Sequence, residues 1–358
     1  MCSSDLGKPS HVLMQEPKNG FLYLLDRDTG KLISAGKYAK VNWADHIDLA
    51  TGRPVEFPDI RYETGATRIY PSTAGAHSWM RMAYSPATGL VYIPYMQFAT
   101  NFHRGEAQEH DVSVTGLNIG DYKLEPGDGT GALIAWDPVA QKLRWKAPLA
   151  TMWNGGVAAT AGGVVFQGTA EGWLVAYDAA TGRQLWRGYA GMGIIGAPMT
   201  YEVAGKQYVA VLAGYGGTAS MFGDATNVGW KYAGPRRLLT FALDAHAPLP
   251  DSPAPTLAVN AVDNPDEALD PKQAAVGKAM FMACAPCHGL GLISAGGPAP
   301  DLRESPIPLS ADAFYTLVHD GLRRQQGMPG FAVFARPQIE AIRQYIRAGQ
   351  RAAAKTKS

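Results

Sequence analysis

The sequence lacks a strong charge of either sign, a long hydrophobic run and more than a few cysteines. Its 358 residues carry a formal net charge of +1, which argues against nucleic acid or an anionic membrane surface as a partner. No apolar run approaches the roughly 18 residues that a membrane-spanning helix needs, so we expect no transmembrane segment. Only three cysteines are present, and no two of them are adjacent. Any cysteine-based site must therefore rest on a single motif.

Turn-forming and aromatic residues, by contrast, are plentiful. The chain has 41 Gly, 25 Pro, 16 Tyr and eight Trp, and 46% of its residues are hydrophobic. Many turns and aromatic-rich strands are typical of an all-β propeller or sandwich and not of a helical bundle. The length allows about two domains.

The first six residues do not resemble the start of a natural protein. They have neither the basic start nor the apolar core of a secretory leader. Residues 2–6 are also what a common sequencing-adapter oligonucleotide encodes when it is read in frame. We therefore expect residues 1–6 to be a non-native scar, and the natural protein to begin further upstream.

A unit of about 40 residues recurs over residues 7–244. Its clearest copies are 135–145 and 176–186, in which the aspartates lie 178 − 137 = 41 residues apart and Trp follows Asp by eight. Weaker copies occur at 25–31 and 85–91. Each copy has the pattern of a strand, a tight turn and a second strand. A period near 40 residues with about four strands per repeat predicts the blades of a propeller.

The side chains that recur in this unit are predicted to be structural. Asp137 and Asp178 are placed to cap the turns through backbone hydrogen bonds, and Trp145 and Trp186 to wedge between neighbouring blades. We assign no catalytic role to them.

The pattern changes after the repeats. Residues 245–264 are rich in proline and polar residues and predict an extended linker. Residues 265–350 show helical periodicity, and the polar tail 351–358 is expected to fray. Asp270, Ser310 and Pro337 mark the starts of three short helices.

A haem-attachment motif lies in this helical region. In the run Cys284-Ala285-Pro286-Cys287-His288, the two thiols can add across the vinyl groups of one haem while the adjacent imidazole binds the iron. A zinc site would need a second cysteine pair, which the sequence does not contain. A thioredoxin-like redox pair would need a βαβ context, which the pattern does not offer. The motif therefore predicts covalently bound haem c.

The second iron ligand is expected from a downstream methionine. Met328 stands in a loop bracketed by glycine and proline, which suits a thioether ligand. Met280 and Met282 compete for this role, but they flank the first predicted helix and are interpreted as core residues. Ligation by His288 and Met328 fills both axial positions and favours electron transfer over ligand binding.

Together the repeats and the haem motif resemble the quinohaemoprotein alcohol dehydrogenases. The resemblance extends from about residue 11 to about residue 348, and the stretches that carry it are 17–27, 75–79, 153–156 and 165–172. It implies a mainly β chain: part of a propeller with four-stranded blades that binds pyrroloquinoline quinone (PQQ), followed by a small all-α domain like a class I cytochrome c.

Two further site residues follow from the resemblance. Lys18 corresponds to the cation that contacts the quinone oxygens, and Asn154 to an amide that contacts PQQ. An ortho-quinone with three carboxylates favours cationic and N–H donors around its rim. The alternative for Lys18 is a solvated turn lysine, and for Asn154 it is ordinary turn chemistry beside two glycines.

The sequence also departs from the family. The family's catalytic Asp, calcium ligands, stacking Trp and vicinal disulfide all lie upstream of the motif that contains Lys18. None of Asp26, Asp45 or Asp48 stands in the family's motif for the catalytic base, so we assign no catalytic residue. We interpret the chain as a C-terminal portion, and expect no dehydrogenase activity from it alone.

The resemblance implies a periplasmic oxidoreductase. It would oxidise a primary alcohol or related small molecule through PQQ, with Ca²⁺ as a further cofactor, and pass electrons singly to haem c. The external acceptor would be a cytochrome, a small redox protein or a quinone-linked chain. Two alternatives stay open: a sugar or aldehyde dehydrogenase of the same superfamily, and a non-enzymatic electron carrier whose blades form a scaffold that binds a partner.

Overall fold

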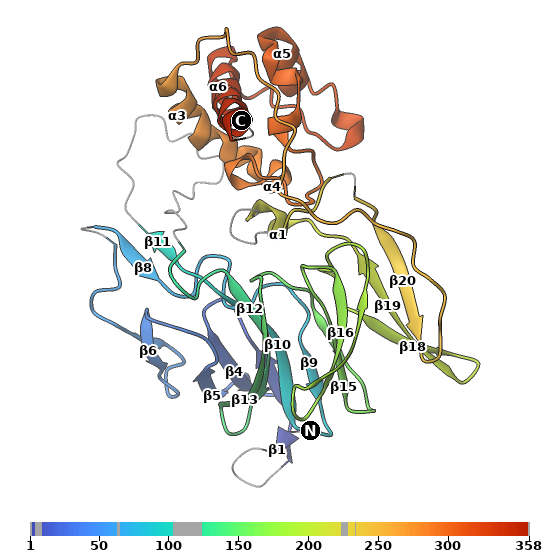
Figure 1. Cartoon of the computed structure of the whole chain (residues 1–358). Coiled ribbons are helices and arrows are strands. Elements are labelled where there is room, and N and C mark those ends of the chain that lie inside the picture. Colours follow the sequence, from blue (N-terminus) through green and yellow to red (C-terminus); the bar gives the residue numbers. More distant parts are fainter. Residues whose placement is uncertain are drawn as a thin grey trace. The chain divides into compact units, whose positions relative to one another are not determined.

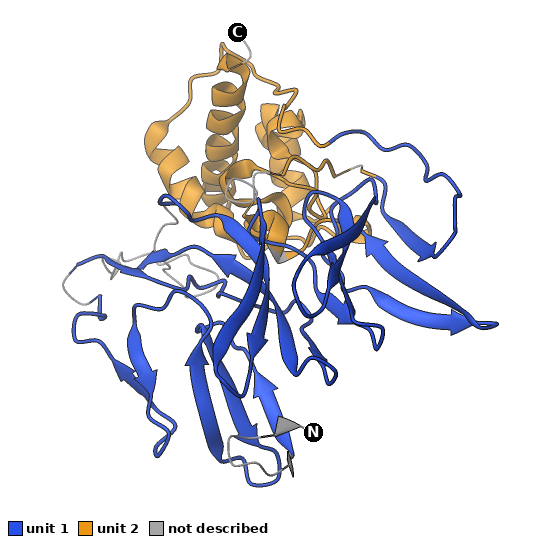
Figure 2. Ribbon diagram, turned by 60° about the horizontal axis from the view of Figure 1, so that its bottom comes forward, with its two compact units in different colours: residues 1–105, 119–214, 235–254 blue, residues 106–118, 215–234, 255–358 orange. Residues whose placement is uncertain are grey.

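The computed structural model describes residues 2–3, 9–62, 65–102, 124–222, 228–232 and 234–356 (Figure 1). The chain divides into two compact units (Figure 2). Unit 1 consists of residues 1–105, 119–214 and 235–254, and unit 2 of residues 106–118, 215–234 and 255–358.

Unit 1 is built from antiparallel strands (Figure 1). The strands are β1 (Cys2–Ser3), β2 (Pro9–Ser10), β3 (Val12–Gln15), β4 (Phe21–Asp26), β5 (Leu32–Lys37), β6 (Ala44–Ile47), β7 (Pro54–Glu56), β8 (Thr67–Ile69), β9 (Ala83–Ser85), β10 (Leu90–Gln97), β11 (Thr100–Phe102), β12 (Thr130–Asp137), β13 (Lys142–Leu149), β14 (Val157–Ala159), β15 (Val164–Gly168), β16 (Trp173–Asp178), β17 (Gln184–Tyr189), β18 (Met199–Val203), β19 (Lys206–Ala213) and β20 (Arg237–Ala242).

Four of the sheets follow one another along the chain. We number them sheet 1 (β3-β4-β5), sheet 2 (β13-β12-β10-β9), sheet 3 (β14-β15-β16-β17) and sheet 4 (β18-β19-β20). The pairs β1–β2, β6–β7 and β8–β11 form two-stranded sheets. Sheets 2 and 3 have the predicted four strands, whereas sheets 1 and 4 have three within the described part of the chain.

The predicted turn chemistry is confirmed. Asp137 Oδ1 accepts backbone N–H bonds from residues 139 and 140, and Asp178 Oδ1 accepts them from residues 180 and 181. Asp26 caps its own turn in the same way. Asp48, between β6 and β7, makes a fourth such turn that the repeat analysis missed. These side chains replace the hydrogen bonds that a tight turn leaves unmade, so their role is structural.

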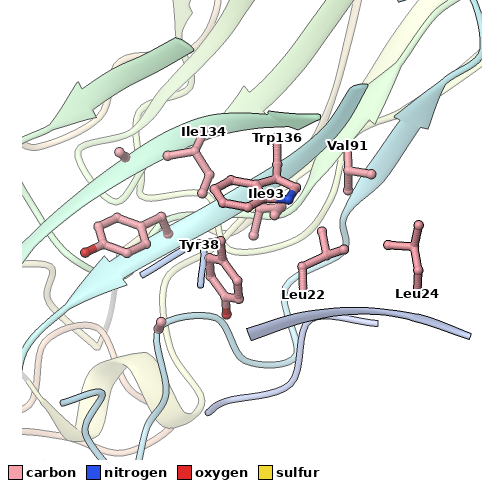
Figure 3. Packing of buried hydrophobic residues seen from close by; sticks show 10 residues of the cluster. Leu22, Leu24, Tyr38, Val91, Ile93, Ile134 and Trp136 are labelled. Atoms are coloured by element: carbon pink, nitrogen blue, oxygen red, sulfur yellow. The ribbon is translucent and has the colours of Figure 1, made fainter. Parts of the chain in front are cut away.

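The sheets pack face to face, because the side chains of each strand alternate in direction. On β10, Val91 and Ile93 pack with Leu22 of sheet 1 (Figure 3). The intervening Leu90 and Tyr92 belong to a second cluster shared with β15 and β16 of sheet 3. A third cluster joins sheets 3 and 4. Each inner sheet is thus buried on both faces, as predicted for consecutive blades of a propeller.

The tryptophans join neighbouring sheets as predicted. Trp145, on β13 of sheet 2, donates its indole N–H to the carbonyl of Ala179 in sheet 3 at 3.0 Å. A Cβ at Gly182 would lie 2.6 Å from the Trp145 ring, so only glycine fits there. Trp186, on β17 of sheet 3, packs edge-on against Phe241 of sheet 4, with ring centroids 5.4 Å apart.

Unit 2 is helical in its described part. Its helices are α1 (Thr218–Met221), α3 (Pro271–Met280), α4 (Ala285–His288), α5 (Ala311–His319) and α6 (Arg336–Lys355), with short 3₁₀ helices η1 (Phe281–Ala283), η2 (Leu290–Leu292), η3 (Leu302–Glu304), η4 (Ile307–Leu309) and η5 (Arg324–Gln326). In the parts of the chain that the structure describes, no helix combines the length and apolarity that crossing a membrane requires.

The predicted helix starts at Asp270 and Ser310 are confirmed. Asp270 caps α3 by accepting bonds from the backbone N–H groups of residues 272 and 273. Ser310 caps α5 by accepting one from residue 313. The third helix begins one residue before Pro337, at Arg336, so Pro337 lies within its first turn.

The structure differs from the predicted boundaries around the helices. Helix α6 continues to Lys355, although the polar tail was expected to fray. The helix continues because Arg351 bonds the carboxylate of Asp263 at 3.0 Å and the carbonyl of Asn264 at 2.7 Å. The proline-rich stretch predicted to be an extended linker is therefore partly anchored in unit 2, where Val259 is also buried.

Candidate haem site and the surroundings of Lys18

The two motif cysteines lie on one turn of unit 2. Cys284 is the N-cap of α4, and Cys287 is in its last turn. Both are free thiols; Cys287 is exposed and Cys284 is partly buried. Burial raises the pKa of the Cys284 thiol to about 12, and the neighbouring Cys287 adds to the rise. The folded turn therefore keeps Cys284 as a neutral thiol.

His288 is held in one orientation. Its ring is 8% exposed, and Nδ1 lies 2.9 Å from the carbonyl oxygen of Pro300. A carbonyl only accepts, so Nδ1 carries the hydrogen and Nε2 is left with its lone pair. Burial lowers the pKa of His288, which favours the neutral ring. A neutral imidazole with a fixed N–H and a free nitrogen is the form that binds a metal.

Met328 lies near the same core. It follows η5 after Gly327, whose φ of +90° favours glycine at that position. Met328 packs against a cluster that contains Phe314, Val318 and Phe334, and Cys284 packs against the same cluster. Of the competing methionines, Met280 is buried in α3 and Met282 is half exposed. The role of Met328 as an iron ligand stays a prediction.

These residues fit a tethered haem by the chemistry of their donors. Unit 2 combines two thiols on one turn, a neutral imidazole with an available Nε2, and a thioether beside the same apolar cluster. Residues with these chemistries are what covalent haem c with His/Met ligation uses. The Pro300 carbonyl that orients His288 is a member of this site that the motif search missed.

Lys18 lies in the turn between β3 and β4. Its backbone carbonyl accepts a bond from Ala76 at 3.2 Å, and its side chain is exposed. A Cβ at Gly75, where φ is +93°, would come within 2.8 Å of the Lys18 Cα, so this close approach requires glycine. The side chain lines a pocket of about 340 Å³ together with Trp43 and Tyr62, among other residues.

Asn154 is buried and hydrogen-bonded within the protein. Its Nδ2 donates to the carbonyl of Thr151 at 2.7 Å, and its Oδ1 accepts from the N–H of Ala170 at 3.0 Å. The side chain is 2% exposed. Asn154 does not line the pocket at Lys18. The structure thus gives Asn154 the turn-holding role that was the alternative interpretation, and its contact with PQQ stays a prediction.

Two buried titratable residues beside Lys18 were missed by the sequence analysis. Glu16 is 1% exposed, and neither of its carboxylate oxygens has a hydrogen-bond partner among the described residues. His77 is 4% exposed, and its Nδ1 lies 2.9 Å from the carbonyl oxygen of Glu16. Burial raises the pKa of Glu16 to about 7. A glutamate after a strand is normally exposed, so no local pattern indicates that Glu16 is buried.

Comparison with protein families matches two parts of the chain. Residues 128–209 match the family described as the β-propeller domain of glucose, ethanol and alcohol dehydrogenases that bind PQQ. Residues 272–346 match the family described as subunit III of cbb3-type cytochrome c oxidase. The first match covers β12 and β13 of sheet 2, all of sheet 3 and part of sheet 4, and the second covers Cys284, Cys287, His288 and Met328.

Individual relatives match nearly the whole chain. The quinohaemoprotein alcohol dehydrogenase ADH IIB of Pseudomonas putida is 47% identical over 349 residues, which is 95% of this chain and 50% of that protein. The quinohaemoprotein alcohol dehydrogenase of Comamonas testosteroni is 36% identical over 360 residues, or 95% of this chain and 49% of that protein.

Comparison with solved structures also finds quinohaemoprotein alcohol dehydrogenases. The quinohaemoprotein alcohol dehydrogenase ADH-IIG from Pseudomonas putida HK5 superposes with a TM-score of 0.84 at 35% identity, over 98% of this chain and 53% of that one. The Comamonas testosteroni enzyme gives a TM-score of 0.79 at 32% identity, over 98% and 52%. These matches confirm the predicted fold class, a propeller segment followed by a helical cytochrome c domain. The chain is a homologue of the quinohaemoprotein alcohol dehydrogenases, and it spans about half the length of the relatives it matches.

Proposed function

We propose that the chain is the electron-transferring portion of a periplasmic quinohaemoprotein alcohol dehydrogenase. In this proposal an alcohol is oxidised at PQQ, with Ca²⁺ as a further cofactor, and electrons pass singly through haem c to an external acceptor. The observation that carries the proposal is the combination, within unit 2, of two thiols on one turn with a His288 ring whose Nδ1 is already bonded. The 47% identity to ADH IIB over half of that protein supports it.

Each haem-site residue has a separate task in this proposal. Cys284 and Cys287 fix the haem to α4 through thioether bonds, so the cofactor cannot dissociate. The Pro300 carbonyl holds the hydrogen of His288 on Nδ1, so Nε2 would be free to bind the iron. Met328 would supply its thioether sulfur as the second protein ligand of the iron. When bound, the haem carries one electron at a time, which suits it to relay the two electrons of a quinol in separate steps.

Lys18 and Asn154 have different tasks on the propeller side. The exposed ammonium of Lys18, in its pocket, supplies a cation for an anionic quinone. Asn154 already uses Oδ1 to accept from Ala170 and one N–H of Nδ2 to donate to Thr151, so only part of its amide is available to PQQ. We therefore assign charge recognition to Lys18, and to Asn154 mainly the support of the loop before β14.

A half-exchange experiment tests the proposed function. The matching half of ADH IIB is replaced by this chain, and the chimera is produced with haem-attachment machinery and supplied with PQQ and Ca²⁺. We expect a primary alcohol to reduce the haem, as seen in its visible spectrum, whereas the chain alone should give no alcohol-dependent dye reduction. A Lys18→Ala chimera should lose most alcohol-dependent reduction and keep its haem.

The electron-carrier alternative predicts a different outcome. The dehydrogenase proposal would be contradicted by a chimera that folds and binds haem but whose haem is reduced by dithionite and not by any alcohol. A chimera carrying Cys284→Ser and Cys287→Ser serves as the control. It should still reduce an artificial dye with alcohol, because dye reduction at the quinone does not need the haem.

The supporting role of Asn154 can be tested by stability. Asn154→Ala removes the bonds to the Thr151 carbonyl and to the Ala170 N–H at a buried position, and we expect a loss of about 1–3 kcal/mol in the free energy of unfolding. Asn42 is a matched control, because it makes two similar bonds, to Tyr70 and Arg68, but is exposed. Asn42→Ala should lower the free energy of unfolding by less than Asn154→Ala does, because water replaces the lost hydrogen bonds. Equal losses in urea unfolding would contradict the assignment.

A further inference from the structure

The loop that carries Met328 presents large apolar side chains to solvent. This loop joins α5 to α6, and we call residues 321–335 the Met328 loop (Figure 1). Leu322 is 69% exposed and Val333 is 82% exposed, and they are the two most exposed large apolar side chains in the described part of unit 2. Single exposed apolar residues are ordinary, but a group of them on one surface marks an interaction site. Two such residues in one short loop therefore indicate a contact surface.

The Met328 loop is folded back on itself. A Cβ at Gly321, where φ is +71°, would lie 2.9 Å from the Gly330 Cα, so the two sides of the loop cross at these glycines. The N–H of Met328 bonds the carbonyl of Arg323 at 3.2 Å. Leu322 directly follows the first glycine, and the exposed valine lies three residues after the second. Both exposed apolar residues therefore lie near this crossing, as does Met328.

The Met328 loop is also cationic. It contains two arginines, both exposed, and no Asp or Glu. The guanidinium of Arg323 bonds the neutral side chain of Gln326 at 2.9 Å. The guanidinium of Arg324 has no hydrogen bond or ion pair within the described part of the chain, and a Cβ at Gly330 would lie 3.1 Å from its Nη2. Two positive charges thus lie beside the exposed apolar residues.

The other arginines of residues 255–358 are neutralised inside the protein. Each of them forms an ion pair with a carboxylate, and they are Arg303, Arg336, Arg343, Arg347 and Arg351. Among the described residues of this region, only the Met328 loop leaves its arginines without a carboxylate. Arginine is enriched at protein–protein interfaces, and it forms strong hydrogen bonds with carboxylates. The distribution of ion pairs therefore favours an acidic partner for this loop.

We propose that the Met328 loop is the docking surface for the external electron acceptor, and that this acceptor is a small acidic redox protein with an apolar patch. The inference rests on the proposed function, because it takes Met328 as an iron ligand. Carboxylates of the acceptor bind Arg323 and Arg324. Its apolar patch covers Leu322 and Val333. As the iron is oxidised from Fe(II) to Fe(III), the acceptor gains one electron, and no bond or proton changes place.

Two other occupants of this surface are disfavoured by its charge. A second copy of the chain would place the same two arginines opposite each other in a symmetric contact, where like charges repel. An anionic membrane attracts each basic residue by about 1 kcal/mol, and lipid-binding segments carry about four to eight of them. The Met328 loop carries two. An acidic redox protein needs only a weak contact, because electron-transfer complexes have small interfaces.

Binding of an acidic probe protein tests the docking surface without electron transfer. The haem-loaded full chain is titrated with plant plastocyanin, an acidic copper protein, while both proteins are oxidised, and calorimetry measures the dissociation constant. We expect this constant to rise at least about tenfold from low to physiological salt, because screening weakens the charge pairing. The double variant Arg323→Gln/Arg324→Gln should bind about tenfold more weakly than the wild type at low salt.

An arginine that is already paired serves as the matched control. Arg336 is exposed like the two loop arginines, but it forms an ion pair with Asp312. Arg336→Gln should therefore change the dissociation constant by less than about threefold.

Electron transfer supplies an independent readout. The chain is reduced with dithionite, freed of excess reductant and mixed with oxidised plastocyanin, and stopped flow records the loss of the blue copper band. Leu322→Ser/Val333→Ser should slow the transfer about tenfold at every salt concentration, whereas the double arginine variant should slow it only at low salt. Oxidation by benzoquinone, a small neutral molecule, should be equally fast in all variants, which shows that the haem and its ligands are intact.

The docking surface is refuted if both double variants bind plastocyanin like the wild type, or if salt does not weaken the binding. A wild-type dimer in sedimentation that Leu322→Ser/Val333→Ser abolishes would assign the surface to a second copy instead. Binding to phosphatidylglycerol vesicles that the double arginine variant abolishes would assign it to a membrane. A chain that docks plastocyanin, but whose chimera with ADH IIB is not reduced by alcohol, contradicts the proposed function and not the docking surface.

Discussion

Replacing both Cys284 and Cys287 by serine is expected to abolish covalent haem attachment completely. A serine hydroxyl does not add across a vinyl group, and both residues lie on the single turn that presents thiols next to His288. The variant produced with haem-attachment machinery should be colourless after acid–acetone extraction, whereas the wild type should keep its haem in the protein pellet. Because both tethers are removed, the expected effect is a complete loss.

Two controls separate attachment from ligation. Cys2→Ser removes the third cysteine of the sequence and should leave the attached haem unchanged. Met328→Leu should keep the haem covalently bound but lose one axial ligand, which lowers the reduction potential and lets added ligands such as cyanide bind the iron. A double-serine variant that retains haem through denaturing extraction would contradict the assignment of the motif. A Met328→Leu variant with an unchanged potential would move the sixth ligand to another residue.

Much of this site was predictable from sequence because its information is local. Cys284, Cys287 and His288 are fixed by spacing along one turn, and a five-residue pattern is enough to find them. The turn aspartates were found for the same reason, since Asp137 bonds backbone groups only two and three residues away. Local patterns of this kind can be recognised in the sequence without any knowledge of the fold.

The features of the fold and of the site that were not predicted depend on contacts between residues far apart in the chain. Glu16 and His77 are 61 residues apart, and nothing in either local stretch indicates that both are buried. The Asp48 turn was missed because its hairpin, β6–β7, lies outside the 40-residue spacing of the clearer copies. The extent of α6 was missed because a polar helix end usually frays, whereas here Arg351 bonds the carboxylate of Asp263 and the carbonyl of Asn264, which are distant in the sequence.

Asp263 also pairs with Arg347, and replacing Arg347 by alanine is expected to destabilise unit 2 strongly. Arg347 is fully buried, and its guanidinium bonds Asp263 at 3.0 Å, Glu267 at 2.9 Å and Gln350 at 2.7 Å. Removing it takes one of two guanidinium partners from each of two largely buried carboxylates, since Asp263 keeps Arg351 and Glu267 keeps Arg343. Breaking a buried ion pair from one side costs about 3–5 kcal/mol, which is a large part of a small domain's stability. Urea unfolding of the haem-loaded chain, followed by helical circular dichroism, measures the loss.

An exposed ion pair of the same helix is the matched control. Arg336, at the start of α6, pairs with Asp312 of α5, and the two side chains are 59% and 85% exposed. Water solvates both groups when the pair is broken, so Arg336→Ala should cost about 0–1 kcal/mol. Similar losses for the two variants would show that the buried cluster stabilises the unit no more than a surface pair does.

The pH dependence of the loss in unfolding free energy caused by Arg347→Ala identifies the electrostatic part of that loss. Burial acts to raise the pKa of Asp263 and Glu267, but their bonds to Arg347 and to the neighbouring Arg351 and Arg343 outweigh burial and lower both pKa values. A carboxyl whose folded pKa is lowered contributes stability above its unfolded pKa and loses it as the pH falls through the folded pKa. The loss on Arg347→Ala should therefore be full at pH 7 and shrink below about pH 4, where the unfolded carboxyls begin to bind protons. A loss that stays constant down to pH 3 would assign the role of Arg347 to packing instead, because its apolar stem is unaffected by protonation of the acids.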